Sequence, residues 1–228
     1  GRAAEAKRHY EQARKAAPES EWSAEALWAL ATMMREDGDA DGAREMVGAI
    51  ISDNPESRLV PWALRLAGDL DLEGNRTEAG LACFQTLIKR YPRHELVPAA
   101  LAGQAWAFLK SGKRAQALKG FQALAASFPD TRYGAEALFR AAVILREDGK
   151  TEEAVRTVEE LLRRHPEGRF AEAALLQRAL GMRDEGDLNG ALIQLRKLRS
   201  RFPASDVVAE ALREEALIHY KLKDRSSE

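Results

Sequence analysis

The stretch TRYGAEALFRAAVILREDGKTEEAVRTVEELLRRHP, residues 131–166, contains the pattern that decides the fold. A first apolar segment runs to Leu145 and stops at Gly149, and a second segment begins at Thr151 and ends at Pro166. Apolar residues recur in both segments at the three- and four-residue spacing of one helix face. Glycine just past a helix end supplies the left-handed conformation that other residues resist. The stretch therefore predicts two antiparallel helices joined by a short turn.

The closing proline of this stretch belongs to a series with a constant spacing of 37 residues. The series consists of Pro18, Pro55, Pro92, Pro129, Pro166 and Pro203. A fixed period of about 20–50 residues is the signature of a repeat protein. Because each repeat in such an array packs only on its neighbours, the period predicts an all-α solenoid of stacked helix pairs.

Each repeat places apolar residues of defined size at fixed distances from its proline. The residue four positions on is large and apolar and is expected to pin the start of the first helix: Trp22, Leu59, Leu96, Tyr133, Phe170 and Val207. Leucine follows at nine positions: Leu27, Leu64, Leu101, Leu138, Leu175 and Leu212. A small residue follows at thirteen: Ala31, Gly68, Ala105, Ala142, Ala179 and Ala216. Eight positions before the next proline, the second helix carries Tyr10, Val47, Phe84, Phe121, Val158 and Leu195. These positions predict the core between the helices.

Helix starts and turns are marked as regularly as the core. Two positions after each proline stand the candidate N-caps Ser20, Ser57, His94, Thr131, Gly168 and Ser205. The first helices end at the turn glycines Gly38, Gly74, Gly112, Gly149 and Gly186. Pro61 and Pro98 are tolerated in a first helical turn and limit how early two of the helices can begin.

These boundaries predict one solenoid over residues 1–228, with about twelve helices. Residues 3–17 match only the second helix of a repeat. Full repeats span 18–54, 55–91, 92–128, 129–165 and 166–202, a C-terminal half repeat spans 203–223, and residues 224–228 form a tail.

The set Gly149, Ala154, Val158, Leu161 and Pro166 resembles the tetratricopeptide repeat, and the resemblance covers essentially the whole chain. The family's usual period is about 34 residues. The longer period and the Pro-x-Ser/Thr start resemble the variant found in bacterial envelope proteins, such as the Tol-Pal coordinator and the barrel-assembly lipoprotein. The resemblance implies a right-handed superhelix whose first helices line a concave groove.

Candidate catalytic and metal-binding residues are sparse. The four histidines, His9, His94, His165 and His219, lie in different repeats without metal-ligand spacing, and Cys83 is expected to be a buried small hydrophobe. The sequence contains no phosphate-binding loop. The basic run Arg196, Lys197, Arg199 and Arg201 is interpreted as a solvated helix face rather than a nucleic-acid site, and the net charge is −1. We therefore expect no enzyme activity, no cofactor, no nucleic-acid partner and no membrane insertion.

The resemblance implies that residues 7, 10, 14 and 17 positions after each proline face the groove. The candidate partner-binding residues at these positions are Trp28, Arg35, Trp62, Arg65, Trp106, Phe139, Val143, Arg146, Leu176, Leu180 and Arg183. Apolar patches of this kind mark interaction sites, and Trp and Arg are enriched at interface hot spots. The alternative is that these residues pack against neighbouring first helices.

We expect a non-catalytic scaffold that binds a peptide or protein in this groove, within a bacterial envelope assembly. Aromatic residues would bury apolar partner side chains, and Arg65, Arg146 and Arg183 would bind partner carboxylates. One alternative is a regulatory or substrate-recruiting segment of a larger envelope enzyme or secretion component, for which a start at Gly1 without an initiator methionine is consistent. Another is self-association through the two half repeats. A periplasmic or envelope location is expected, with the cytoplasm as the alternative.

Overall fold

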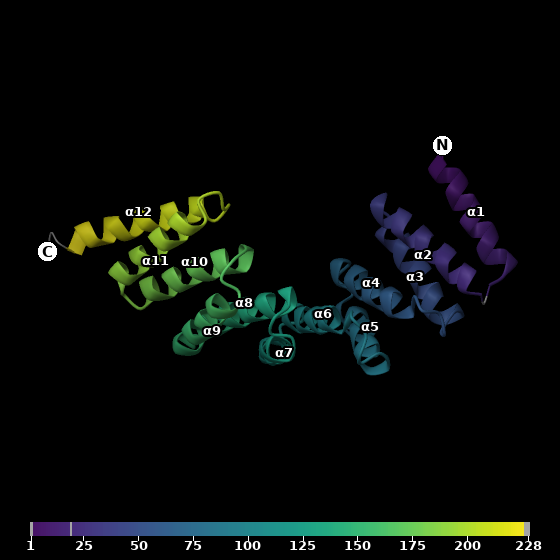
Figure 1. The fold of residues 1–228 in the computed structure, drawn as a ribbon, viewed down its shortest axis with the longest axis horizontal. Helices are drawn as coiled ribbons and strands as arrows, with labels where there is room; N and C mark the ends of the chain where they lie inside the picture. Colours follow the sequence, from purple (N-terminus) through teal and green to yellow (C-terminus); the bar gives the residue numbers. More distant parts are fainter. Residues whose placement is uncertain (1, 19, 226–228) are drawn as a thin grey trace. The chain divides into compact units, whose positions relative to one another are not determined.

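The structure, a computed structural model, describes residues 2–18 and 20–225, and this part of the chain contains twelve α-helices and no strand (Figure 1). The helices are α1 (Arg2–Ala16), α2 (Glu21–Glu36), α3 (Ala40–Asp53), α4 (Val60–Glu73), α5 (Thr77–Arg90), α6 (Val97–Lys110), α7 (Arg114–Ser127), α8 (Arg132–Glu147), α9 (Thr151–Arg164), α10 (Arg169–Asp184), α11 (Leu188–Arg201) and α12 (Val208–Arg225). The all-α prediction and the number of helices are confirmed.

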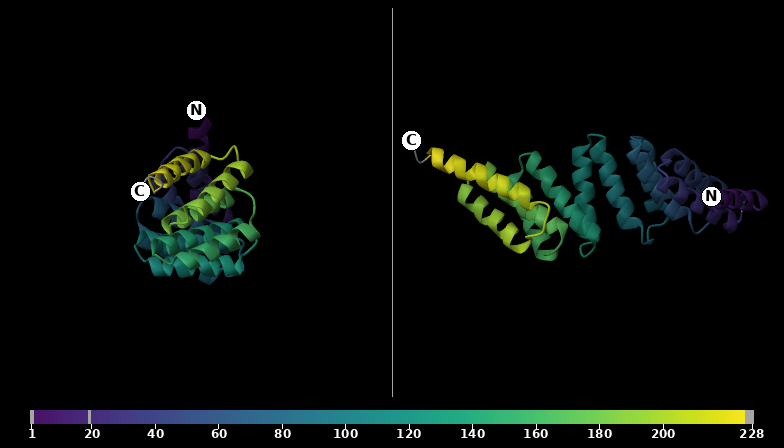
Figure 2. Two further views of the ribbon diagram at one scale, coloured as in Figure 1. Left: turned by 90° about the vertical axis from the view of Figure 1, so that its left-hand side faces the viewer. Right: turned by 90° about the horizontal axis from the view of Figure 1, so that it is seen from above.

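Residues 1–120 and 121–228 form two compact units. In the first unit, α2 packs on α3 and α4 on α5, and each pair contacts the next through α3 with α4 and α5 with α6. The second unit repeats this arrangement with α8 on α9, α10 on α11, and α11 on α12. Figure 2 shows these antiparallel pairs from two further sides. Consecutive helix pairing is the packing that the 37-residue period predicted.

The first helices begin in two different ways. Ser20 and Thr131 are N-caps as predicted, and their side-chain oxygens accept hydrogen bonds from the backbone N–H of the third residue on, at 3.2 and 3.1 Å. Ser57, His94 and Ser205 are not N-caps, which corrects the prediction. Each accepts from the backbone N–H two residues on, in a turn that precedes the helix. The helices α4 and α6 then begin at valine, with proline in the first turn.

The predicted left-handed turn residues are confirmed at four of the five turns. Gly38, Gly112, Gly149 and Gly186 have φ values of 82°, 71°, 74° and 88°. In the remaining turn, Gly74 has φ −78° and the left-handed residue is Asn75, with φ 60°. Asparagine tolerates this region better than other non-glycine residues because its short polar side chain bonds locally. The left-handed residue of the second turn therefore lies 37 residues after Gly38, like the others in the series, but it is an asparagine instead of a glycine.

The core forms where a large side chain of a second helix meets small residues of first helices. Phe84 on α5 is fully buried. A Cβ atom added at Gly68 on α4, or at Gly103 on α6, would come within 2.5 Å of its ring. The two glycines therefore allow consecutive first helices to close on one phenylalanine. Leu27, Leu64 and Leu175, nine positions after their prolines, are at most 2% exposed, as predicted.

Four residues predicted to be buried are exposed in the structure. Trp22 is 74% exposed, Tyr10 is 36% exposed and Leu212 is 45% exposed, and Ala216 is also exposed. Trp22 follows a half repeat, so a complete preceding pair does not cover it. Tyr10 and Leu212 lie on α1 and α12, which have no partner helix of their own repeat among the described residues. These positions are those of core residues, but no helix in the described part of the chain covers them.

Side chains just before the repeat prolines join consecutive repeats. The side-chain Nδ2 of Asn54 donates to the carbonyl oxygen of Pro18 at 3.0 Å. His165 Nε2 donates to the carbonyl oxygen of Pro129 at 2.7 Å. Each hydrogen bond spans 36 residues of sequence and reaches back to the preceding junction.

Candidate binding surface of the first helices

First helices lie next to one another in both units, where α4 contacts α6 and α8 contacts α10. Of the eleven candidate residues, Arg35 and Trp62 are exposed and Leu176 is buried. The other eight are partly exposed: Trp28, Arg65, Trp106, Phe139, Val143, Arg146, Leu180 and Arg183. The tight-packing alternative therefore describes Leu176, whereas most of the set remains accessible.

In the first unit, an open hollow lies between the C-terminal ends of α4 and α6. It has a volume of about 420 Å³ and is lined by Leu72 and Glu73 of α4 and by Trp106, Leu109 and Lys110 of α6. Lys110 Nζ donates to the carbonyl oxygen of Leu72 and so ties the two helix ends together. Three apolar side chains form the wall, and one carboxylate and one ammonium lie with them.

Two of the three apolar residues that line the hollow were not among the sequence candidates. Leu72 and Leu109 each lie 17 positions after a repeat proline, a position that the resemblance already assigned to the groove. This position in the repeat would have identified both leucines, but the candidates from these two repeats were aromatic or basic residues.

Another aromatic contact lies at the start of α4, at the opposite end of the repeat from this hollow. The ring of Trp62, which is 38% exposed, meets His94 edge-on, with centroids 6.0 Å apart. His94 also contacts Tyr91 at 6.5 Å. His94 lies at the junction between two repeats and contacts an accessible tryptophan.

In the second unit, aromatic residues and arginines lie together. The rings of Phe139 and Phe170 have centroids 6.0 Å apart, and the guanidinium of Arg140 lies 5.3 Å from the Phe139 centroid. Burial lowers the pKa of Arg140 below its ordinary value. Phe139 therefore belongs to a packed aromatic cluster that is still partly accessible.

The three arginines expected to bind partner carboxylates are paired within the chain. Arg65 pairs with Asp69. Arg146 pairs with Asp184 at 3.4 Å, and Arg183 pairs with Asp184 at 2.7 Å and with Glu214. The hydrogen bond to Asp184 raises the pKa of Arg183 above its ordinary value. These ion pairs hold first-helix side chains in place, so a partner carboxylate would have to compete for them.

Other candidate chemistry is dispersed. Within the described residues, no group of three or more His, Cys, Asp and Glu side chains is arranged to hold a metal ion. No helix among them has the length and apolar character needed to cross a bilayer. Cys83 is partly buried, and burial raises the pKa of its thiol, which disfavours the thiolate nucleophile. In the basic run on α11, Arg199 pairs with Glu215 at 2.8 Å and Arg201 with Glu167 at 2.9 Å.

Comparison with known proteins agrees with this geometry. Two sequence models of the tetratricopeptide repeat match the chain, one over residues 102–169 and the other over residues 62–94 and 173–205, which together make up more than half of it. A search of curated proteins gives no significant match. The twelve helices of residues 2–18 and 20–225, packed in consecutive pairs around small residues, define a helical-repeat protein. Its repeats are tetratricopeptide repeats, and the chain belongs to that family.

Solved structures show the same fold at low sequence identity. A tetratricopeptide repeat protein from Parabacteroides merdae has a TM-score of 0.71 and 16% identity, over 90% of this chain and 75% of that one. PilW, described as a type IV pilus biogenesis factor, has a TM-score of 0.67 and 20% identity, over 89% and 87%. YrrB, described as having an unusual peptide-binding site, has a TM-score of 0.63 and 14% identity, over 90% and 97%.

Proposed function

We propose that the chain is a non-catalytic scaffold that holds a peptide or protein segment against its first helices. The observation that carries this proposal is the accessibility of Trp106 over an apolar hollow, with Trp62 exposed on the adjacent first helix. Tryptophan on an accessible surface is a typical interface anchor. A surface made by packed helices is preformed, so binding costs little ordering on this side. YrrB, a structural relative, is described as binding a peptide.

Retention of partners from a lysate tests this proposal with matched variants. The wild-type chain is compared with Trp106→Ala in the first unit and Phe139→Ala in the second, alone and combined. Trp22→Ala is the control, because this tryptophan is 74% exposed and lies outside the groove positions. We expect a protein that the wild type and the control retain and the double variant loses. Equal retention by all variants with unchanged helical melts would contradict the proposal.

We further propose that this scaffold acts in a bacterial envelope assembly, either by itself or as the recruiting segment of a larger envelope enzyme or secretion component. The 37-residue period supports the envelope role, and PilW, a structural relative, is described as a pilus biogenesis factor. Fractionation of source cells with an antibody against the chain tests the location. Recovery only in the cytoplasmic fraction would contradict it, and the size of the detected band would distinguish a separate scaffold from a larger enzyme.

A second candidate function is self-association, in which α12 of one copy binds α1 of another. Leu212 and Ala216 on α12 are exposed, whereas the equivalent Leu175 and Ala179 are buried against the second helix of their repeat. The helix α1 has the register of a second helix, and its Tyr10, equivalent to Phe84, is also exposed. The helix α12 of one copy is a first helix without its second helix, and α1 of another copy is a second helix without its first, so the two complement each other.

Light scattering over a concentration series tests this contact. The mass of the wild type should increase with concentration, because a head-to-tail contact does not close on two copies. Leu212→Glu should abolish the increase. Ile193→Glu on α11, where the native side chain is 61% exposed, is the control and should leave it unchanged. A monomer mass throughout the series would rule the contact out.

A further inference from the structure

The repeat that contributes Trp106 has an unusual distribution of charge. No Asp or Glu occurs between Glu95 and Asp130, although the chain contains 36 such residues. At least two carboxylates lie within three residues of each of the other turn positions, Gly38, Gly74, Gly149 and Gly186. Within the same distance of Gly112, the only charged residues are the cations Lys110, Lys113 and Arg114. One turn edge is therefore positive where the others are negative.

This charge is unfavourable for the helix that follows the turn. Carboxylates at a helix N-terminus are stabilising, because the backbone N–H groups there carry partial positive charge, and cations are destabilising for the same reason. The helices α3 and α11 have aspartate N-caps, Asp39 and Asp187, and α5 and α9 have glutamates in the first turn. The helix α7 has no acidic residue in its first turn; it begins at Arg114, directly after Lys113. A local rule of helix stability is broken at one of five equivalent places, as happens at functional sites.

Two of these three cations, Lys110 and Lys113, are accessible and are not neutralised as cations are at the preceding turn. Lys110 and Lys113 are exposed, and neither forms an ion pair with any residue that the structure describes. At the preceding turn, in contrast, Arg76 pairs with Asp71 at 2.8 Å and with Asp41 at 3.0 Å. The turn at Gly112 thus keeps positive charge available to a partner.

This turn directly follows the wall of the apolar hollow. Trp106, Leu109 and Lys110 line the hollow from the last turn of α6, and Lys113 comes three residues later. Glu73 is the single carboxylate of the wall, so the cations of the turn outnumber it. The volume of about 420 Å³ falls in the range of pockets that hold ligand groups, which is roughly 300–1,000 Å³.

We propose that the hollow and the turn together bind an acidic segment of a partner protein, with one large apolar side chain on Trp106 and flanking carboxylates against Lys110 and Lys113. The inference rests on the proposed scaffold function and adds the chemistry of the partner. The apolar side chain supplies affinity by burial against the indole, and the carboxylates set orientation and speed association. A phosphate group alone would use the cations and leave the hollow empty.

Selection of displayed random peptides on the immobilised full chain tests this chemistry. The enriched peptides should carry Asp or Glu next to Leu, Phe, Trp or Met. A synthetic peptide of the enriched sequence should bind less tightly as salt increases, because exposed charges are screened. Trp106→Ala should weaken its binding by about 30-fold, the effect of losing a hot-spot anchor.

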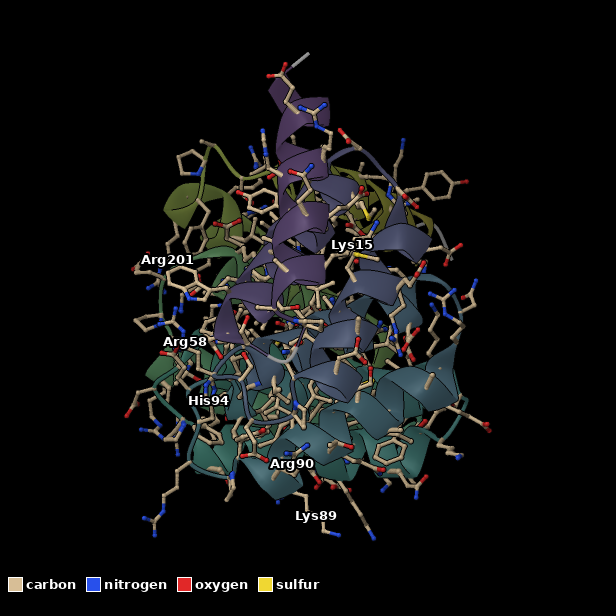
Figure 3. All side chains as sticks on the ribbon, turned by 90° about the vertical axis from the view of Figure 1, so that its right-hand side faces the viewer. Lys15, Arg58, Lys89, Arg90, His94 and Arg201 are labelled. Carbon is tan, nitrogen blue, oxygen red and sulfur yellow. The ribbon has the colours of Figure 1, made fainter. Side chains whose placement is uncertain are left out.

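Charge reversal at Lys113 separates binding from folding. Lys113→Glu should weaken peptide binding by about three- to tenfold, and it should also raise the thermal midpoint of the protein, because a carboxylate at the start of α7 is favourable. Lys89→Glu makes the same charge change in the last turn of α5, where the Lys89 side chain is exposed (Figure 3). This residue is not part of the hollow, so the change should leave binding unchanged.

Three results would overturn the inference: enrichment of basic or uncharged peptides, no enrichment at all, or binding that is indifferent to both Trp106→Ala and Lys113→Glu. Failure of this inference does not by itself contradict the scaffold proposal. If the combined Trp106→Ala and Phe139→Ala variant loses a partner whose binding segment is not acidic, the acidic-segment inference is wrong and the scaffold proposal stands.

Discussion

The guanidinium Nε of Arg44 donates to a carboxylate oxygen of Asp71 at 2.8 Å and so joins α3 to α4 across two consecutive repeats. The Asp71 side chain is 2% exposed, and its second oxygen accepts from Arg76 Nε, also at 2.8 Å. Neutralising it would leave two guanidinium groups facing each other. We expect Asp71→Asn to lower the free energy of unfolding by about 2–3 kcal/mol, below the ~3–5 kcal/mol of a fully buried pair because both arginines reach solvent.

Urea titration followed by circular dichroism measures this loss. Asp41→Asn is the control, because Asp41 pairs with Arg76 while its side chain is 85% exposed, and its loss should change stability by less than about 1 kcal/mol. Equal effects of the two substitutions would show that burial of Asp71 is not what makes this carboxylate important.

Gly181 lies inside α10 where a methyl group would meet nothing within 4 Å. Glycine in a helix interior is less stable than alanine by about 0.5–1 kcal/mol. Gly181→Ala should therefore stabilise the second unit by roughly that amount in a thermal melt. Gly68→Ala has the same intrinsic gain, but its methyl group would collide with the Phe84 ring, so we expect net destabilisation of about 1–3 kcal/mol. The two identical changes should have opposite signs.

Leu175 and Leu212 occupy equivalent positions in consecutive repeats, but Leu175 is fully buried and Leu212 is 45% exposed. Leu175→Ala should cost about 2–5 kcal/mol in denaturant unfolding, because it leaves a cavity between α10 and α11. Leu212→Ala should cost less than half as much. A similar loss at both positions would mean that the α12 face is covered in solution.

The reactivity of Cys83 should depend on folding. Burial raises the pKa of this thiol above its ordinary value of 9.0, so at a given pH the folded protein contains less thiolate than the unfolded chain. The thiolate is the species that is alkylated. Iodoacetamide should therefore react more slowly with the native protein than with the urea-unfolded protein between pH 8 and 9. The unfolded chain loses its proton first as pH rises, so this residue lowers stability in alkaline solution. Equal alkylation rates would contradict the burial.

The fold could be predicted because its determinants recur at one spacing. The prolines of the junctions recur every 37 residues, and the leucines nine positions on are buried in four of the repeats, at Leu27, Leu64, Leu138 and Leu175. Local departures were harder to predict. Gly74 and Asn75 are neighbours that both accept a left-handed conformation, and the preference for glycine pointed to Gly74, whereas Asn75 adopts it.

The candidate surface could be predicted only in part. The register of the first helices identified Trp106 and Trp62, but periodicity shows which face a residue is on and not whether another helix covers it. Periodicity therefore could not predict that Trp22 is exposed and that Leu176 is buried. Ion pairs such as Arg183 with Glu214 join residues that are 31 positions apart, and a list of candidate residues from single helices cannot anticipate them.

The hydrogen bonds from Asn54 to Pro18 and from His165 to Pro129 reach back by one repeat and no further. Each repeat is therefore stabilised by contacts with its direct neighbours, and the free energy of unfolding of the chain is close to a sum over the repeats and their junctions. Opening at one junction removes contacts from the two repeats that meet there and leaves more distant junctions intact. Under tension or partial denaturation, the molecule should come apart in stages, with each unravelled length close to one 37-residue period.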